Sequence, residues 1–174
     1  MMKTKCELSG VERFFDRSEV IVSKTDTKGR IIYANRVFQR VAGYNEAELI
    51  GAPHSVVRHP GMPRCVFKLL WLTLNQKREI FAYVVNKAKN GDHYWVFAHV
   101  TPSLDEQGNI VNFHSSRRVP ERSAIAKIEP IYQKLLGIEQ SYKNRKDGTE
   151  AAFSAVVQML GEQGIGYDEF IFSL

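Results

Sequence analysis

Two segments of the chain collect side chains suited to binding a small molecule. The run His54–Pro63 places two histidines and an arginine among prolines and apolar residues, a composition that suits a shaped loop better than a regular helix or strand. Further along, the run Asn86–Trp95 predicts a hairpin whose turn is Asn90-Gly91-Asp92. Guanidinium, imidazole and amide groups in these two segments are the first side chains to consider for a binding site.

Arg58, His59 and Asn86 offer the most useful chemistry. Arginine is a forked cation that suits a pyrophosphate, and histidine is a second donor. The amide of Asn86 provides both a donor and an acceptor to a heterocycle, within a strand otherwise rich in apolar residues. Each residue also has a structural interpretation: Arg58 holding loop carbonyls, His59 lying on the surface, and Asn86 serving as a polar residue of an edge strand.

The composition is that of a globular protein. The chain has 174 residues, of which 44% are hydrophobic and 25% charged, which suits one domain with appendages. No apolar run approaches the roughly 18 residues of a membrane span, and the N-terminus lacks the apolar segment of a secretory signal. Cys6 and Cys65 have neither disulfide nor metal spacing. We therefore expect a cytoplasmic protein without direct membrane insertion.

The charge and the motifs argue against two classes of function. The net charge is +5, yet the basic residues are scattered and no recognition helix is evident, so we expect no nucleic-acid binding. The chain also lacks the nucleophile, zinc-protease and phosphate-loop motifs of common enzymes. The sequence predicts a binding protein, not an enzyme.

Short strands and capped helices must position the candidate residues. Asp26–Gly29 predicts a tight turn between two strands, and Asn35 and Asn45 predict the N-caps of two short helices. Pro63 suits the first turn of a longer helix with an apolar stripe. The strands are predicted over residues 19–23, 30–33, 80–89, 93–102 and 110–118.

This order of elements predicts an α+β domain, in which short helices pack on one side of a five-stranded antiparallel sheet. Within the strand over residues 93–102, Trp95 and His99 share one face, and Tyr94 and Val96 share the other. The periodicity leaves open which of these faces lines a pocket.

Three parts are predicted along the chain: an amphipathic N-terminal cap at residues 1–18, a main domain at 19–119 and a C-terminal helical extension at 120–174. In the cap, Leu8, Val11 and Phe14 recur at helical spacing, which suits a helix that covers the core or caps a dimer.

The C-terminal extension is predicted to contain two helices and an apolar tail. Pro130 is expected to bend or interrupt the first helix, over residues 121–136, and a polar linker follows at 143–148. Thr149 is predicted to cap the last helix. The tail at residues 167–174 is too apolar for a disordered end, so it packs on the body or docks on a partner.

Two sequence blocks carry a family resemblance. HxxVRHPxMP at residues 54–63 and KNGDHYWV at residues 89–96 resemble the PAS domains of bacterial aerotaxis receptors, the Aer type. The resemblance covers about residues 20–135. It implies the PAS fold, a non-covalently bound FAD, and a role in reporting cellular redox state to the chemotaxis machinery.

The resemblance also implies the site. Positions that the Aer-type family needs for FAD are matched by Asn35, Arg58, His59 and Asn86. Asn35 also has a structural interpretation, as a helix cap alone. The complete predicted cofactor-binding set is Asn35, His54, Arg58, His59, Phe67, Trp71, Asn86 and Trp95.

Phe67 and Trp71 resemble the aromatic positions of the helix beneath the flavin ring, although an aromatic stripe at helical spacing also suits a core. His54 occupies the place where light-sensing flavin domains carry their adduct-forming cysteine. Because this chain has no thiol there, adduct photochemistry is not expected.

Two positions depart from the Aer-type pattern. Gly61 stands where those receptors have Asp, and Ile80 stands where they have a flavin-affecting Trp. Two alternatives to FAD therefore stay open. One is a haem-binding gas or redox sensor that ligates iron through a histidine, and the other is a cofactor-free PAS module used for protein association.

The resemblance implies the partners as well. Full aerotaxis receptors continue into a membrane anchor and a signalling coiled coil, whereas this sequence stops at Leu174. We therefore expect a stand-alone PAS protein, a possible homodimer, that signals to a separate membrane chemoreceptor or another signalling protein.

Overall fold

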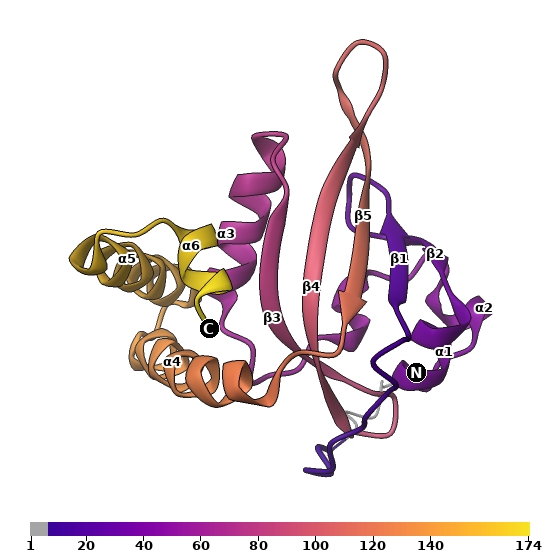
Figure 1. The fold of residues 1–174 in the computed structure, drawn as a ribbon, viewed down its shortest axis with the longest axis horizontal. Coiled ribbons are helices and arrows are strands. Elements are labelled where there is room, and N and C mark those ends of the chain that lie inside the picture. Colours follow the sequence, from indigo (N-terminus) through magenta and orange to yellow (C-terminus); the bar gives the residue numbers. More distant parts are fainter. Residues whose placement is uncertain (1–6) are drawn as a thin grey trace.

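A five-stranded antiparallel sheet forms the centre of the molecule (Figure 1). The structure, a computed structural model, describes residues 7–174. The strands follow the spatial order β2-β1-β5-β4-β3, so β2 and β3 are the edge strands. The predicted sheet is confirmed, and its strands are β1 (Ile21–Thr25), β2 (Ile31–Ala34), β3 (Ile80–Lys87), β4 (His93–Leu104) and β5 (Ile110–Arg118).

The helices fall into two groups (Figure 1). The first group lies between β2 and β3 in the chain: α1 (Arg36–Ala42), α2 (Glu46–Leu49), a 3-10 turn (His54–Val57) and α3 (Arg64–Asn75). The second group follows β5 and gathers beyond the β3 edge, next to α3 and away from α1 and α2. Its members are α4 (Arg122–Ser141), α5 (Arg145–Gln163) and α6 (Tyr167–Phe172). Among residues 7–174, no helix is long and apolar enough to cross a membrane.

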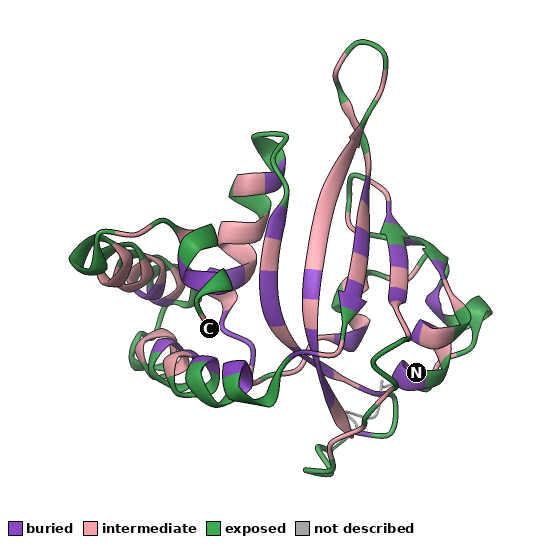
Figure 2. Cartoon of the chain, in the orientation of Figure 1, coloured by how far each residue is buried: buried purple, intermediate pink, exposed green. Residues whose placement is uncertain are grey.

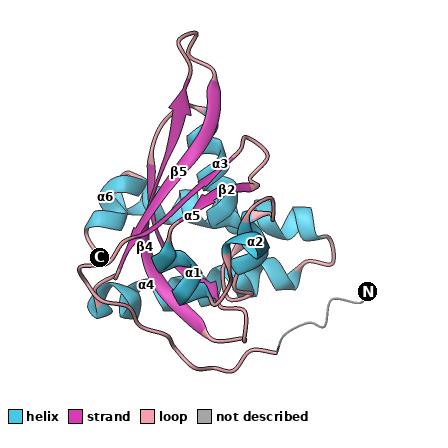
Figure 3. Ribbon diagram, turned by 90° about the vertical axis from the view of Figure 1, so that its right-hand side faces the viewer, coloured by secondary structure: helices cyan, strands magenta, loops and turns pink. Residues whose placement is uncertain are grey.

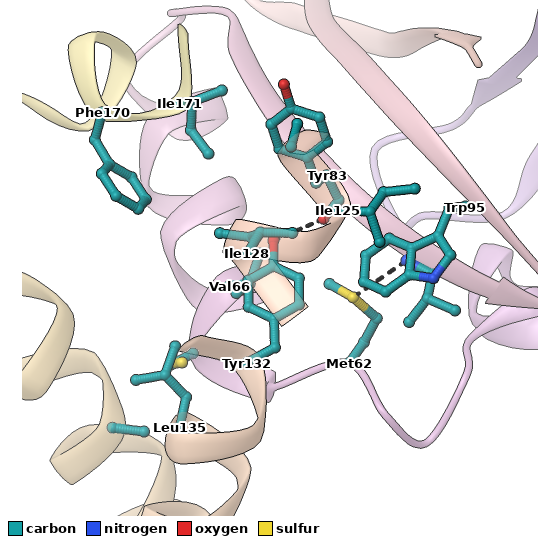
Figure 4. Close-up of a cluster of buried hydrophobic side chains, with 14 residues drawn as sticks. Met62, Val66, Tyr83, Trp95, Ile125, Ile128, Tyr132, Leu135, Phe170 and Ile171 are labelled. Carbon is teal, nitrogen blue, oxygen red and sulfur yellow. Dashed lines mark hydrogen bonds between the residues drawn. The ribbon is translucent and has the colours of Figure 1, made fainter. Parts of the chain in front are cut away.

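Two main apolar clusters pack against the sheet. Figure 2 shows the buried residues of the chain in purple. On one face of the sheet, Ile21, Phe38 and Val96 are fully buried with the short helices. Around the other face and the β3 edge, the second cluster joins the sheet and α3 to the C-terminal helices (Figure 4). Its larger members are Met62, Val66, Tyr83, Trp95, Ile125, Ile128, Tyr132, Leu135, Phe170 and Ile171.

The free edge of β3 is closed by side chains. The Tyr132 hydroxyl of α4 donates to the carbonyl of Tyr83 at 2.7 Å, and the Tyr167 hydroxyl of α6 donates to the carbonyl of Phe81 at 2.9 Å. The backbone N–H of Val85 donates to the sulfur of Met62 at 3.4 Å. An exposed strand edge invites pairing with another chain, so these contacts both protect β3 and attach the C-terminal helices to it.

The predicted helix caps are confirmed. The side chain of Asn35 accepts from the backbone N–H of Phe38 at 2.9 Å, and Asn45 forms a full capping box with Glu48. Gly43 ends α1 with a φ of 73°, in the left-handed region that glycine enters without a steric cost. The long β4–β5 hairpin projects beyond the helices, as Figure 3 shows most clearly.

The predicted N-terminal helix is wrong over residues 7–18, and residues 1–6 lie outside the described part of the chain. Residues 7–18 run as a loop whose backbone pairs with the β3–β4 hairpin: Ser9 N–H donates to the Gly91 carbonyl, and His93 N–H donates to the Val11 carbonyl. Arg13 adds a 2.8 Å ion pair to Asp92. These tertiary hydrogen bonds outweigh the helical spacing of a few apolar residues.

The C-terminal extension differs from its prediction in the cap of α5 and in the missing interruption at Pro130, whereas the tail takes one of its two predicted places. Asn144, not Thr149, caps α5, and the hydroxyl of Thr149 donates to the carbonyl of Arg145 one turn earlier. Helix α4 continues through Pro130. The apolar tail packs on the body as α6, where Phe170 and Ile171 are buried.

Candidate functional site

A cavity of about 270 Å³ lies between the sheet, α3 and the loop before α3. Its apolar walls come from both sides, for example Leu70 of α3 and Val84 of β3. Polar groups reach it from β1, β3, β5 and the loop. The lining residues that matter below are Ser23, His54, Arg58, Phe67, Trp71, Asn86, Ser115 and Arg117. A mostly apolar hollow with a few convergent polar groups is the usual form of a small-molecule site.

Five of the eight predicted site residues meet in this cavity: His54, Arg58, Phe67, Trp71 and Asn86. The structure therefore resolves the choice of sheet face. The face with Val84, Asn86 and Ala98 lines the cavity, and the face with Trp95 and His99 lies opposite.

Asn86 presents an amide without a protein partner to the cavity. The residue is only 5% exposed, yet its side chain forms no hydrogen bond to any residue in 7–174. A backbone bridge joins Asn86 to Arg58, so the strand and the loop hold each other in place. Because Asn86 lines the cavity and its amide has no partner among the protein side chains, the amide is available to a ligand.

Arg117 brings a cation to the same cavity without a carboxylate partner. It is 4% exposed and donates to the hydroxyl of Ser23 and, at 2.7 Å, to Nε2 of His54. Burial lowers the pKa of Arg117 to about 10, so the guanidinium stays charged at neutral pH. Phe38 packs beneath it, with the guanidinium carbon 5.1 Å from the ring centre.

His54 is held neutral beside Arg117. Enclosure of the imidazole and the neighbouring guanidinium charge lower its pKa to about 3. Since Arg117 donates to Nε2, that nitrogen is the acceptor of the neutral ring. His54 thus acts as a neutral hydrogen-bond acceptor for the buried guanidinium of Arg117.

Two polar atoms of the cavity wall lack any partner within the described chain. They are the hydroxyl oxygen of Ser115 and Nη1 of Arg117, both on β5. Buried polar atoms are nearly always paired, so this pair marks a place where a ligand atom completes the hydrogen bonding. The sequence interpretation overlooked Ser23, Ser115 and Arg117. The signal was present on β5, where Ser115 and Arg117 are two residues apart and share a face.

Arg58 lies at the rim of the cavity. Its guanidinium carbon sits 4.1 Å from the ring centre of Phe67, a close cation–π contact. Burial lowers the pKa of Arg58, and the positive charges of Arg64 and Arg145 lower it further against the opposing effect of Glu139. Trp71 packs edge-on to Phe113 at 5.3 Å between ring centres and closes the far wall.

Asn35 does not line the cavity. Its amide nitrogen donates to the carbonyl of Val20 at 2.8 Å, and its oxygen accepts from the backbone N–H groups of Val22 and Phe38. These bonds tie the start of α1 to β1. The observed role of Asn35 is therefore the structural one.

His59 and Trp95 lie on the other side of the sheet from the cavity. Trp95 stacks on Tyr132 of α4, with ring centres 6.3 Å apart. Nδ1 of His59 accepts from the backbone N–H of Gly61 at 3.0 Å, and a side chain at Gly61 would bring a Cβ within 2.8 Å of that nitrogen. A side chain at position 61 would therefore require the imidazole of His59 to move.

Ile80 is buried with Leu74 and Phe113 in a third, small cluster. It fills core space where the Aer-type pattern has a tryptophan. Among residues 7–174, no group of three or more histidine, cysteine, aspartate or glutamate side chains is arranged to hold a metal ion.

A family model described as the PAS fold matches residues 31–117, which hold four of the five strands and most of the cavity lining. The chain belongs to the PAS fold family. It is 42% identical over 115 residues to the aerotaxis receptor of Escherichia coli, covering 66% of this chain and 22% of the receptor. It is 30% identical over 103 residues to the nitrogen fixation regulatory protein of Klebsiella pneumoniae, covering 59% of this chain and 21% of that protein.

The PAS chain thus spans about a fifth of the length of these two relatives. Among solved structures, the dark state of the blue-light photoreceptor Aureochrome1 LOV superposes with a TM-score of 0.56 at 24% identity. That match covers 66% of this chain and 85% of the photoreceptor chain, and it shows the shared fold. The similarity to an aerotaxis receptor and to a nitrogen fixation regulator relates this PAS domain to sensory and regulatory proteins.

Proposed function

We propose that this chain is a PAS redox sensor that binds FAD non-covalently and signals to a separate chemotaxis receptor. The observation that carries the proposal is the pair of buried polar atoms without partners, the Ser115 hydroxyl and Nη1 of Arg117, on residues that line the same cavity as Asn86. The similarity to the aerotaxis receptor supports the choice of a flavin and of a chemotaxis partner.

The residues present fit an isoalloxazine ring. Leu70 and Val84 supply apolar surface for its faces, and the Asn86 amide supplies a donor and an acceptor for its polar edge. Arg117 would hold negative charge that develops at that edge, since no carboxylate neutralises it. Bound FAD supplies reversible electron transfer, and the protein residues supply orientation and electrostatics.

The same geometry disfavours haem. His54 is the only histidine that lines the cavity within the described chain, and its Nε2 already accepts from Arg117. An iron ligand needs that nitrogen's lone pair free. A cofactor-free module is disfavoured too, because it would leave the Ser115 hydroxyl and Nη1 of Arg117 buried without partners.

In this proposal residues 19–119 sense and residues 120–174 transmit. Asn86 would respond through its amide to a change in charge on a bound ring, and β3, which carries Asn86, would pass that response on. Tyr132 and Tyr167 connect the edge of β3 to α4 and α6, which gives the response a direct route into the C-terminal helices. The sensor would act in the cytoplasm on a membrane receptor.

The absorption spectrum of the purified protein tests the cofactor. A flavin spectrum supports FAD, a Soret band supports haem, and no chromophore supports the cofactor-free module. Asn86→Ala should lower flavin occupancy while the far-ultraviolet circular dichroism stays unchanged. Asn75→Ala is the matched control, since Asn75 lies exposed at the end of α3. Equal flavin occupancy in both variants would remove Asn86 from the site.

Hydrogen exchange tests the route of the signal. We expect the protection of residues 80–86 and of α6 to differ between oxidised and reduced protein, because β3 and α6 share the Phe81–Tyr167 hydrogen bond. Binding to an aerotaxis-type receptor should then depend on the redox state. Identical exchange in both states would contradict transmission through β3.

A further inference from the structure

A second cavity, of about 240 Å³, lies on the opposite side of the sheet from the first. Val84 and Asn86 of β3 line the first cavity. Val85, which lies between them, lines the second cavity together with Trp95 of β4, because successive side chains of a strand point to opposite faces. Helix α4 forms a further wall, where Tyr132 stacks on Trp95 (Figure 4). The proposed function leaves this cavity unused.

The N-terminal segment ahead of β1 closes the second cavity on the outside. Leu8 and Gly10 of this segment line the cavity. Two backbone hydrogen bonds fix the segment to β4. Arg13 N–H donates to the carbonyl of His93 at 2.7 Å, and His93 N–H donates to the carbonyl of Val11 at 2.9 Å. The outer wall is therefore held in place by main-chain hydrogen bonds.

Two imidazoles line the cavity from neighbouring elements. They belong to His59 of the loop and His93 of β4, and their ring centres are 5.8 Å apart. Nδ1 of His59 accepts from the backbone N–H of Gly61, so the neutral ring carries its proton on Nε2, which is a donor. Burial and the nearby His93 and Lys87 lower the pKa of His59, so this ring is neutral at neutral pH. The two rings thus offer N–H donors that suit a carboxylate, and the bond to Gly61 leaves His59 no lone pair for a metal ion.

The α4 wall carries the opposite charge. Glu129 lines the cavity and has no ion-pair partner within residues 7–174, and Gln133, one turn later, lines it too. On the other wall, Lys87 lies directly opposite His93 in the register of β3 and β4 and adds positive charge there. A simple anion would be repelled by Glu129, and a simple cation would leave the imidazole donors unused. A ligand with both charges satisfies both walls.

We propose that this second cavity binds a free α-amino acid with an apolar side chain. The imidazoles of His59 and His93 donate to its carboxylate, and the carboxylate of Glu129 accepts from its ammonium group. Trp95 and Val85 receive the apolar side chain. This site goes beyond the proposed function, and its binding chemistry does not depend on a flavin.

The two cavities share the loop before α3 and strand β3. Arg58 lines the first cavity, and the next residue, His59, lines the second. Asn86 and its neighbour Val85 divide in the same way. A bound amino acid therefore contacts the neighbours of two residues of the first cavity and regulates the affinity of that cavity for flavin, a consequence that rests on the proposed function.

Isothermal titration calorimetry on the full chain tests the site, with L-leucine as the probe. Two analogues separate its charges: isocaproate lacks the ammonium group, and isoamylamine lacks the carboxylate. We expect L-leucine to bind at least about tenfold more tightly than either analogue, because only the amino acid engages both walls.

Two variants identify the walls. Glu129→Gln and His93→Phe should each lower leucine affinity by about tenfold while the far-ultraviolet circular dichroism stays unchanged. Glu129→Gln should not weaken isocaproate binding, because that acid has no ammonium group. Glu169→Gln is the matched control, since Glu169 is an exposed carboxylate of α6 that does not line the cavity.

Three results would overturn the amino-acid site: no leucine binding at millimolar concentration, isocaproate binding as tight as that of leucine, or unchanged leucine affinity in both variants. Flavin affinity should differ by about fivefold or more with and without saturating leucine, and equal affinities would overturn the regulation. If the wild type binds no flavin, the proposed function fails, and the leucine titration still decides the second cavity.

Discussion

Arg117 donates a hydrogen bond to Nε2 of His54 at 2.7 Å, and the two side chains form one wall of the cavity. A buried guanidinium is thus held by neutral acceptors, Ser23 and His54, in place of a carboxylate. Burying an uncompensated charge lowers stability, and a ligand with negative character at this point offsets that cost. The buried guanidinium of Arg117 therefore also defines the place where a ligand with negative character would bind.

Replacing Arg117 should separate stability from binding. Arg117→Gln removes the buried charge, so we expect the ligand-free protein to be at least as stable as the wild type. Flavin affinity should fall by about tenfold or more, since a charge-assisted hydrogen bond is lost. Thermal unfolding and fluorescence titration measure the two effects. Arg118→Gln, on the exposed neighbouring position, should change neither, and undiminished flavin binding by Arg117→Gln would refute the role given to Arg117.

His54 should make stability depend on pH. Its pKa is about 3 in the folded state, below the ordinary value of 6.5, so the unfolded chain binds more protons between these values. The free energy of unfolding should therefore fall as the pH drops from about 6.5 toward 3, by at most about 1.4 kcal/mol per pH unit. Above pH 6.5 this contribution is constant.

Denaturant titrations across that pH range measure the effect. His54→Gln keeps an acceptor for Arg117 but cannot be protonated, so the pH dependence of its stability should be shallower than that of the wild type. His114→Gln is the control, because only part of that side chain is enclosed and the lowering of its pKa is smaller. Parallel curves for wild type and His54→Gln would show that His54 does not titrate in this way.

The hydroxyl of Tyr132 should stabilise the edge of β3. Tyr132→Phe leaves the buried carbonyl of Tyr83 without its 2.7 Å hydrogen bond, which should cost about 1–3 kcal/mol of unfolding free energy. Hydrogen exchange over residues 80–86 should become faster. Tyr142→Phe, at an exposed position, is the control and should leave both quantities unchanged. Wild-type exchange rates in Tyr132→Phe would argue against a clamp on β3.

Two glycines of α5 should respond in opposite directions to alanine. A Cβ at Gly148 would lie 2.4 Å from the carbonyl oxygen of Glu139, so Gly148→Ala must push α5 away from α4 and should cost about 1–3 kcal/mol. Gly161 has open space around it, and Gly161→Ala should stabilise the helix by about 0.5–1 kcal/mol. Chemical denaturation measures both. A tolerated Gly148→Ala would mean that the close approach of α4 and α5 is dispensable.

The local elements of this protein follow from its sequence. The caps at Asn35 and Asn45 and the turn at Asp26–Gly29 involve side chains that bond to backbone groups within a few residues, so no distant contact is needed to form them. The five strands follow from alternation and turn spacing in the same way. Phe67, Trp71 and Asn86 reached the cavity because they lie on a helix and a strand that local patterns predict.

The tertiary structure decided what local rules leave open. Alternation along β4 groups Trp95 with His99, but only the packing of α4 against Trp95 determines that this face lies away from the cavity. The extended N-terminal segment depends on hydrogen bonds to a hairpin distant in sequence. Arg117 becomes a buried cation of the cavity wall only in the folded chain, where Ser23 of β1 and His54 of the loop accept its hydrogen bonds. Such choices depend on which surfaces bury each other, and that is a property of the whole chain, not of a sequence window.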